Sequence, residues 1–296
     1  MAERTHEPVM LGEILDVLPL KPGAVVVDGT LGLGGHSIKF AEKIAPGGTL
    51  VGLDWDESML ARAKDRLADV KDIQVHLVHN DFRNLSEVLK GLGVQADGIL
   101  LDLGLNSAQV DDPERGLSFM ADGPLDMRMD RSSGEPASSL LNRMSPAEIE
   151  QMLFDFGDER WARAIAKRIV ERRKVRPLRR TGDLVECVLE AIPPRARDKR
   201  INPATRSFQA IRIVVNGELE GLEEALHDAA ASLKPQGVLA VLSYHSGEDR
   251  IVKHAFRDLS QEGYEELSKK PIAPTEDEVR RNSRSRSAKL RALRCI

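Results

Sequence analysis

Short runs of β-branched and aliphatic residues alternate with segments of helical periodicity in the first hundred residues. Four such runs lie at residues 24–28, 49–54, 73–79 and 98–102. Between them, residues 37–44 and 57–68 place apolar side chains at helical spacing. This alternation predicts βαβ units on a parallel sheet. We therefore expect an α/β fold built on an open sheet.

The chain of 296 residues changes character after Asp102. Loops rich in Gly, Pro and Ser follow, and then strongly charged helices without clear strands. Residues 160–174 illustrate these helices, because Trp161, Ile165 and Ile169 are spaced by four beneath a basic face. We expect an inserted helical domain at residues 109–209 with a role in substrate recognition.

Strand character returns at residues 237–243, after an amphipathic helix at 218–233 and a Lys-Pro-Gln-Gly turn at 234–237. The sheet is thus expected to be completed from both ends of the chain. Residues 1–108 and 210–296 together would form the core of the fold.

Basic residues are concentrated in two parts of a chain whose formal net charge is -4. Residues 160–206 contain 15 Lys and Arg against 5 Asp and Glu, and residues 280–296 contain 7 against none. One such block usually marks a solvated helix face, but two blocks on an otherwise acidic chain favour a surface that binds a nucleic acid. Arg172, Arg173 and Arg176 are expected to contact phosphates there.

The sequence lacks the features of membrane, secreted and thiolate-metal proteins. No run of 18 apolar residues occurs, and residues 1–8 carry charges where a signal peptide would be apolar, so we expect a cytoplasmic protein without membrane association. Cys187 and Cys295 form no Cys-x-x-Cys pair. Neither a disulfide framework nor a metal site is expected, and no obligatory protein partner is indicated.

A glycine-rich loop follows the first predicted strand, in the run Asp28-Gly-Thr-Leu-Gly-Leu-Gly-Gly-His36. Glycines let a ligand approach the backbone at the carboxyl edge of a parallel sheet, where α/β folds bind nucleotides. Counted from Gly32, the third glycine of a dinucleotide fingerprint is replaced by Ser37. A carboxylate at Asp28 would repel a pyrophosphate but attract the ammonium and sulfonium groups of S-adenosylmethionine. S-adenosylmethionine is therefore the expected cofactor.

Two further strand ends carry side chains suited to an adenosine. Asp54 ends the second predicted strand, 20 residues after Gly34, where a carboxylate can accept hydrogen bonds from both ribose hydroxyls. An Asp at a strand end often only caps the next helix, but the spacing from the glycine loop favours the ribose. After the third strand, Asn80, Asp81 and Phe82 are candidates to hold the adenine, although a lone Phe is as often a core residue.

The fourth predicted strand ends in Asp102, beside the expected position of the methyl group. Methyl transfer to an amine is an in-line displacement, which requires an oriented nitrogen lone pair and a proton acceptor. Asp102 can serve this purpose or bind the cofactor's ammonium group, and both roles stay open. Methylation at a ring carbon would need a Cys nucleophile, and neither Cys lies in a strand-end loop.

The fifth predicted strand leads into Tyr244 and His245 at the same edge of the sheet. Tyr244 is a candidate for stacking on a target base, and His245 for contacting that base as a second catalytic residue. A lone His near a strand end is, however, more often a structural residue with satisfied hydrogen bonds.

Longer motifs extend through much of the chain. They are the loop at 28–37, LDLG at 101–104, DDPERGLSF at 111–119, GPLDMRMD at 123–130, NPATR with FQAIR at 202–212, and HSGEDRIVK at 245–253. Together they resemble those of the ribosomal RNA small subunit methyltransferase H family, also called MraW. Departures are few: Asn106 and Ala108 stand where Ser and Pro are usual, Tyr244 where Phe is usual and Gly247 where Leu is usual.

The resemblance implies a class I, Rossmann-like S-adenosylmethionine-dependent methyltransferase core with a helical insertion. It also implies methylation of N4 of a cytidine in the decoding region of small-subunit (16S) ribosomal RNA, with an assembled or nearly assembled subunit as the expected substrate. The cofactor contacts that it implies are Gly34, Gly35, His36, Asp54, Phe82, Asp102 and Gln109. The chemistry of the loop adds Asp28 and Gly32 to this set.

The sequence disfavours three other functions. A DNA amino-methyltransferase would carry an Asp/Asn-Pro-Pro-aromatic loop after the fourth strand, and the sequence has none there. A noncatalytic RNA-binding protein of the same fold would have a degraded cofactor loop, whereas this loop is intact. A nicotinamide oxidoreductase is disfavoured by Asp28 and Ser37.

Overall fold

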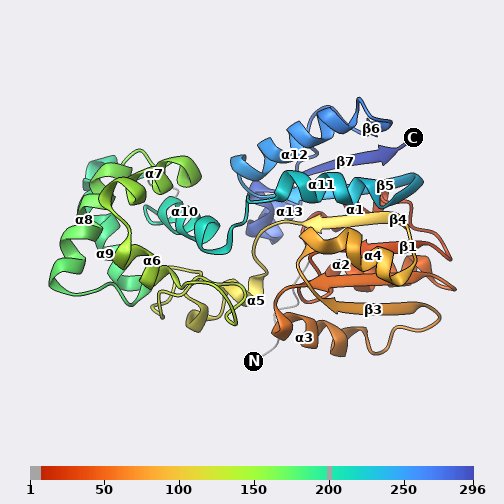
Figure 1. The fold of residues 1–296 in the computed structure, drawn as a ribbon, viewed down its shortest axis with the longest axis horizontal. Coiled ribbons are helices and arrows are strands. Elements are labelled where there is room, and N and C mark those ends of the chain that lie inside the picture. Colours follow the sequence, from red (N-terminus) through yellow and green to blue (C-terminus); the bar gives the residue numbers. More distant parts are fainter. Residues whose placement is uncertain (1–7, 199–201) are drawn as a thin grey trace. The chain divides into compact units, whose positions relative to one another are not determined.

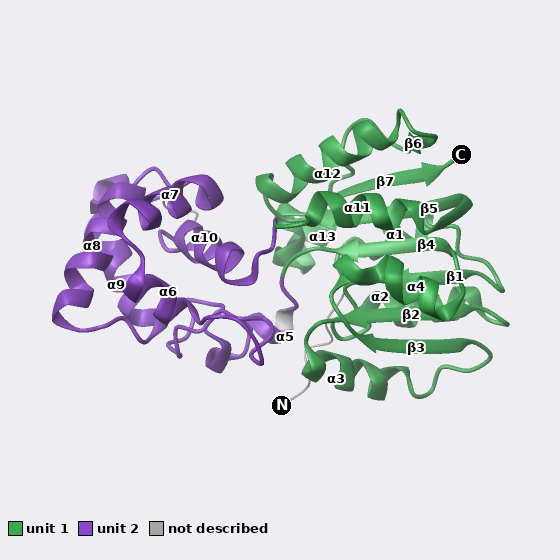
Figure 2. Cartoon of the chain, viewed as in Figure 1, with its two compact units in different colours: residues 1–104, 220–296 green, residues 105–219 purple. Residues whose placement is uncertain are grey.

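The computed structural model describes residues 8–198 and 202–296. Residues 1–7, which carry most of the charged N-terminal segment noted above, and residues 199–201 of the first basic block lie outside the described residues. The chain forms two compact units, Met1–Gly104 with Glu220–Ile296 and Leu105–Leu219 (Figure 2). Within the described ranges, no helix is long and apolar enough to cross a membrane.

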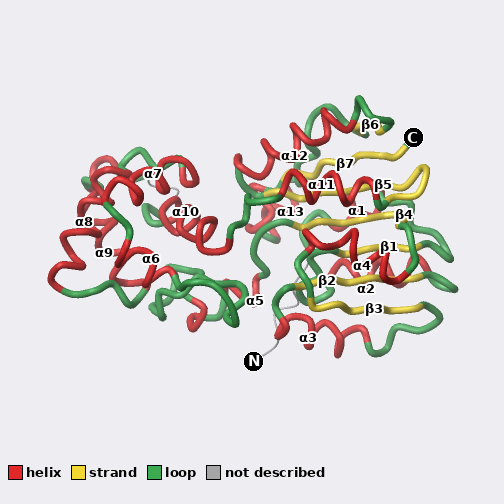
Figure 3. Tube along the Cα trace, in the orientation of Figure 1, coloured by secondary structure: helices red, strands yellow, loops and turns green. Residues whose placement is uncertain are grey.

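A seven-stranded sheet forms the centre of the first unit (Figures 1 and 3). Its strands are β1 (Val25–Asp28), β2 (Thr49–Asp54), β3 (Gln74–His79), β4 (Ala96–Asp102), β5 (Leu233–Ser243), β6 (Tyr264–Glu266) and β7 (Lys289–Cys295). Their order is β3-β2-β1-β4-β5-β7-β6. Strands β1 to β5 are parallel, and β7 pairs antiparallel with β5 and β6. The order reverses between β1 and β4, which is where open α/β sheets bind ligands at their carboxyl edge.

Helices cover both faces of this sheet (Figure 1). The elements are α1 (Leu11–Val17), α2 (Gly35–Ile44), α3 (Glu57–Leu67), α4 (Leu85–Leu92), α11 (Leu222–Ala231), α12 (Ser246–Leu259), α13 (Glu276–Arg281) and the 3-10 helices η1 (Phe82–Asn84) and η4 (Ser283–Ser287). Ile14, Phe40 and Ala63 of α1, α2 and α3 share one buried cluster with Val26 and Leu50 of the sheet. Helices α4, α11 and α12 pack together on the other face, because successive strand residues point to opposite sides.

The alternation predicted from the sequence is confirmed, and all five predicted strands end at the predicted residue. The turn predicted at residues 234–237 is wrong. These residues belong to β5. The strand is irregular there, because its register against β4 shifts between Ala96 and Gly98 and Gln236 has a φ of 67°. Strands β6 and β7 were not predicted, because β7 lies within the second basic block and its buried Arg291 reads as a surface residue.

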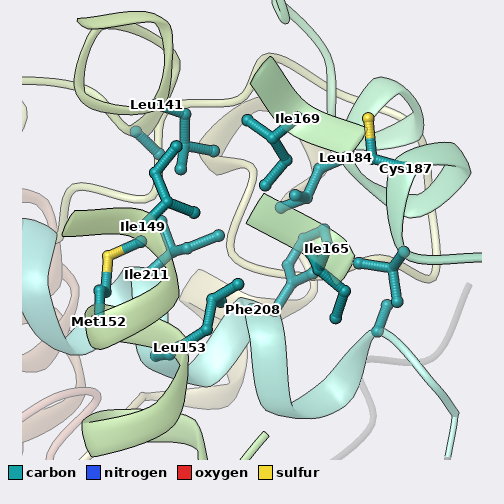
Figure 4. Close-up of a cluster of buried hydrophobic side chains, with 14 of the residues drawn as sticks. Leu141, Ile149, Met152, Leu153, Ile165, Ile169, Leu184, Cys187, Phe208 and Ile211 are labelled. Atoms are coloured by element: carbon teal, nitrogen blue, oxygen red, sulfur yellow. The ribbon is translucent and has the colours of Figure 1, made fainter. Parts of the chain in front are cut away.

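The second unit is helical. Its elements are α5 (Ser107–Val110), η2 (Pro113–Arg115), α6 (Ala137–Arg143), α7 (Pro146–Gly157), α8 (Ala162–Val175), α9 (Thr181–Ala191), η3 (Pro194–Ala196) and α10 (Thr205–Asn216). A capping box between Ser145 and Glu148 begins α7. Ile149, Ile165 and Ile211 from α7, α8 and α10 meet in a fully buried core (Figure 4). This unit therefore has a hydrophobic core of its own.

The boundaries of the second unit differ from those expected at residues 109 and 209. The structure places them at Leu105 and Leu219. The reason is α10, which continues to Asn216 without a break and buries Phe208 and Ile211 in the core of the second unit.

Candidate functional site

Three aspartates end three neighbouring parallel strands of the first unit. Asp28, Asp54 and Asp102 are the last residues of β1, β2 and β4, which are adjacent in the sheet. Asp28 is 1% exposed, Asp54 is 9% exposed, and the side chain of Asp102 is 24% exposed. The folded chain therefore brings three carboxyl groups to the carboxyl edge at the switch point.

Asp28 is tied to the loop that follows it. Its Oδ2 accepts a hydrogen bond from the Ser37 hydroxyl at 2.7 Å, and its Oδ1 accepts one from the backbone N–H of Thr30 at 3.3 Å. Burial raises the pKa of this carboxyl to about 6, although the hydrogen bond from Ser37 opposes the shift. A nearby cation would therefore stabilise the ionised form of Asp28.

Asp54 joins the glycine-rich loop to β2. Its Oδ2 accepts a hydrogen bond from the backbone N–H of Gly32 at 2.7 Å, and its Oδ1 accepts one from that of Asp56 at 2.8 Å. Burial raises the pKa of Asp54 to about 6. The cap of α3 is Asp56, which accepts from Ser58, so Asp54 is not the capping residue. Each Asp54 oxygen keeps a second lone pair for a ligand.

The glycines of the loop meet specific steric demands. Gly32 and Gly34 have φ values of 52° and 71°, in the left-handed region that glycine adopts without strain. A Cβ at Gly35 would stand 2.9 Å from Pro8, and one at Gly29 would stand 2.5 Å from Leu101. Helix α2 begins immediately after the loop. The loop thus brings bare backbone to the carboxyl ends of β1 and β2.

His36 lies in the first turn of α2 and is buried. Its Nε2 donates to the Val9 carbonyl at 3.0 Å, since a carbonyl oxygen can only accept. Burial lowers the pKa of His36, so the ring is neutral and Nδ1 carries a lone pair. Nδ1 stands 3.8 Å from Oδ2 of Asp102.

Asp102 is fixed at two points. Its backbone N–H donates a hydrogen bond to the Thr30 hydroxyl oxygen at 2.6 Å. Its Oδ1 accepts a hydrogen bond from the Tyr244 hydroxyl at 2.7 Å. Burial raises the pKa of Asp102 to about 7, and the Tyr244 hydrogen bond opposes this rise. A carboxyl group that titrates near neutral pH is suited to accept a proton during a reaction.

The residues expected near an adenine are partly engaged with one another. Asp81 caps η1 and forms an ion pair with Arg83 at 2.6 Å, and Asn80 accepts from the backbone N–H of Asp81. Phe82 is half-buried, and its Cβ would be 3.4 Å from a Cβ at Gly29. Phe82 therefore lies beside the end of β1, next to the loop.

His245 has a structural role in the folded chain. It is the N-cap of α12, where its Nδ1 accepts from the backbone N–H groups of Gly247 and Glu248. Its Nε2 stands 3.2 Å from Oε1 of Glu248, and the side chain is 8% exposed. Nδ1 is thus used to cap α12, whereas Nε2 is buried without a hydrogen-bond partner among the described residues. The structural interpretation noted for a lone His accounts for Nδ1 alone, and the contact with a target base stays a prediction.

Gln109 belongs to the second unit. It is buried, and its side-chain oxygen accepts from the backbone N–H of Asn106 at 3.2 Å. The cofactor contact expected of Gln109 stays a prediction.

The MraW methylase family matches residues 3–296, which is nearly the whole chain. The chain belongs to this family. A relative from Pelobacter propionicus is 46% identical over 99% of both chains, and one from Sorangium cellulosum is 47% identical over 98% of this chain and 91% of its own. Both are named ribosomal RNA small subunit methyltransferase H. A crystal structure of an rRNA methylase from Streptococcus thermophilus is 12% identical, covers 97% of this chain and 93% of its own, and has a TM-score of 0.45.

Sequence reasoning missed two hydroxyl contacts in this member of the MraW methylase family and assigned a third residue differently. Ser37 binds Asp28 and Thr30 binds the backbone of Asp102, although both follow β1 within the loop already singled out. Tyr244 was a candidate for stacking on a base, but its hydroxyl binds Asp102. Only the pairing of β4 with β5 reveals that contact.

Several basic residues expected to bind phosphate also have partners within the protein, and their contact with phosphate stays a prediction. Arg172 and Arg176 form ion pairs with Asp183, and Arg173 donates to the Leu141 carbonyl. In the second basic block, Lys289 and Arg291 bind Asp249 at 2.7 and 2.8 Å. The charge counts therefore overstate the cationic surface that is free to meet a polyanion.

Proposed function

We propose that this protein methylates the N4 amino group of a cytidine in the decoding region of small-subunit ribosomal RNA. The class of activity follows from family membership and from the names of the relatives: the protein is an S-adenosylmethionine-dependent rRNA methyltransferase. The atom, the base and its region are the proposal. It is supported by the geometry at Asp102, which carries the argument.

The residues at the switch point fit S-adenosylmethionine. Asp28 and Asp54 are buried carboxyl groups with raised pKa values, so a cationic ligand beside them would relieve the cost of ionising them. When bound, the cofactor supplies a methyl group activated by a sulfonium. We propose that the loop through Gly32, Gly34, Gly35 and His36 cradles its amino-acid end. Asp54 would accept hydrogen bonds from the ribose hydroxyls, and Phe82 would contact the adenine.

Oδ2 of Asp102 is the oxygen suited to act on the target amine. It accepts no hydrogen bond from residues 8–198 or 202–296, because Tyr244 uses Oδ1 and the facing Nδ1 of His36 carries no proton. The lone pair of a cytosine amine is delocalised into the ring. A carboxylate that accepts its N–H favours the attacking geometry, and it takes up the proton as the N–CH₃ bond forms and the S–CH₃ bond breaks.

Asp102 has a second possible role, which is to bind the cofactor's ammonium group. The two roles predict different effects of Asp102→Asn. Loss of an ammonium partner would weaken cofactor affinity, whereas loss of the amine acceptor would lower kcat and leave that affinity within a fewfold of wild type. We assign no proton transfer to His245, because its Nδ1 caps α12 and its side chain is buried.

The second unit is proposed to recognise the RNA. Arg163, Lys167 and Lys174 are exposed on one face of α8, four and seven residues apart. Lys167 lies 3.8 Å from Glu171, and the other two form no ion pair within the described part of the chain. Such a face binds phosphates by charge and shape more than by base sequence. An assembled or nearly assembled subunit, which presents that shape in the cytoplasm, is therefore the proposed substrate.

The test is to identify the methylated nucleoside. Unmodified small subunits, protein-free rRNA and DNA are each incubated with labelled S-adenosylmethionine and the protein, and digests are analysed by mass spectrometry. We expect label in N4-methylcytidine, most of it from subunits, and none with Asp102→Asn. Label in 5-methylcytidine, in a ribose methyl group or only in DNA would overturn the proposal.

A further inference from the structure

Tyr244 is held on three sides next to Asp102. Asp102 and Leu242 are register partners in the parallel strands β4 and β5, so the residues that follow them lie side by side. The Tyr244 hydroxyl donates to Oδ1 of Asp102 at 2.7 Å. Its ring lies against Gly104, where a Cβ would be 3.3 Å from Cδ2, and its backbone N–H donates to Oε2 of Glu248 at 2.7 Å. The phenol therefore has a fixed place and a single direction of donation.

The two oxygens of Asp102 are consequently not equivalent. Oδ1 is occupied by the Tyr244 hydroxyl, whereas Oδ2 faces the unprotonated Nδ1 of His36 at 3.8 Å. If the Tyr244 hydroxyl were absent, nothing described around the side chain would favour this orientation of the carboxyl group over one rotated about its terminal bond.

We infer that Tyr244 is a positioning residue for methyl transfer, whose hydroxyl orients the Asp102 carboxyl group, leaves Oδ2 free for the reacting amine and stabilises the ionised form. This inference rests on the proposed function, because it takes Asp102 to act at the reacting centre. Tyr244 itself transfers no proton. Burial and the neighbouring Asp102 keep the pKa of Tyr244 well above its ordinary value, so the phenol stays protonated and only donates.

The charged groups around Asp102 set the direction of the expected pH effect. Burial raises the pKa of Asp102 to about 7, the Tyr244 hydrogen bond lowers it, and the charge of Glu248 on α12 raises it. Asp28 of β1 lies close enough for its own pKa to be raised by Asp102, and burial lowers the pKa of His36 of α2. Glu278 of α13 acts on Tyr244 and His36. Removing the hydroxyl leaves only influences that raise the pKa of Asp102 or do not change it.

The experiment compares Tyr244→Phe with Tyr264→Phe, which removes the hydroxyl of the only other tyrosine, on β6. The measured quantity is kcat/KM for methylation of small subunits between about pH 6 and pH 9. A hydrogen bond to a carboxylate shifts its pKa by about one unit. For Tyr244→Phe we therefore expect the acidic limb to move up by about one pH unit, with about fivefold lower kcat/KM at pH 7 and near-wild-type values at pH 9. Tyr264→Phe should follow the wild-type profile.

Two outcomes would overturn the inference. One is an unchanged profile for Tyr244→Phe, and the other is an equal loss at every pH, which a purely structural role would produce. A second measurement is independent of turnover: the carboxyl ¹³C shift of Asp102, assigned by its disappearance in Asp102→Asn, is titrated in the protein alone. A higher midpoint in Tyr244→Phe supports the inference, and an equal midpoint overturns it. Absence of methylation by the wild type would instead overturn the proposed function.

Discussion

The raised pKa of Asp102 predicts how the stability of the protein depends on pH. Burial moves this pKa from 3.8 to about 7, so between these values the folded protein holds a proton that the unfolded chain has released. This contribution to stability therefore falls as pH rises through the window and levels off above the folded-state pKa. A shift of about three units corresponds to about 4 kcal/mol, because each unit is worth about 1.4 kcal/mol.

Asp102→Asn removes the titrating carboxyl group but keeps a side-chain oxygen that accepts the hydrogen bond from the Tyr244 hydroxyl. Relative to wild type, the variant should gain about 2 kcal/mol in free energy of unfolding between about pH 5.5 and about pH 8.5, because roughly half of the effect lies in that interval. Urea denaturation at the two pH values measures the difference. Asp69→Asn, which alters an exposed carboxyl in the turn after α3, is the control. The reasoning would be refuted if Asp102→Asn differed from wild type by the same amount at both pH values.

Three further predictions concern cofactor, fold and substrate. Asp54→Ala should weaken S-adenosylmethionine binding at least tenfold by calorimetry, because it removes the anchor of the Gly32 N–H as well as the ribose acceptor; an unchanged Kd would contradict the assignment. His245→Ala should lower the free energy of unfolding by about 1 kcal/mol through loss of the α12 cap, and equal stability would argue against that role. Changing Arg163, Lys167 and Lys174 together to Glu should weaken rRNA binding and flatten its salt dependence without altering cofactor affinity, whereas equal salt slopes would mark the face as merely solvated.

The strands could be predicted from the sequence because each short apolar run ends in a polar residue where the chain leaves the sheet. Asp28, Asp54 and Asp102 stand at three such ends. Since parallel strands share a carboxyl edge, the sequence pattern alone predicts that these carboxyl groups lie together. Their roles toward cofactor and substrate stay predictions.

Features that depend on distant partners could not be predicted in this way. The Tyr244 contact requires the register of β5 against β4, which joins residues 142 apart in sequence. Likewise, the burial of Arg291 in β7 depends on Asp249, 42 residues away. Counting basic residues locates the positive charge in the sequence but does not identify its acidic partners. Asp183, for example, forms ion pairs with both Arg172 and Arg176.

The discontinuous first unit has a consequence for synthesis on the ribosome. Strand β4 pairs with β5 along one edge, but β5 is translated only after the whole of Leu105–Leu219. At elongation rates of about 5–20 residues per second, that edge stays unpaired for on the order of ten seconds. During this time its backbone N–H and C=O groups are open to other chains. The helical unit, which has its own core, is available to fold first, and the sheet that carries the three aspartates is closed last.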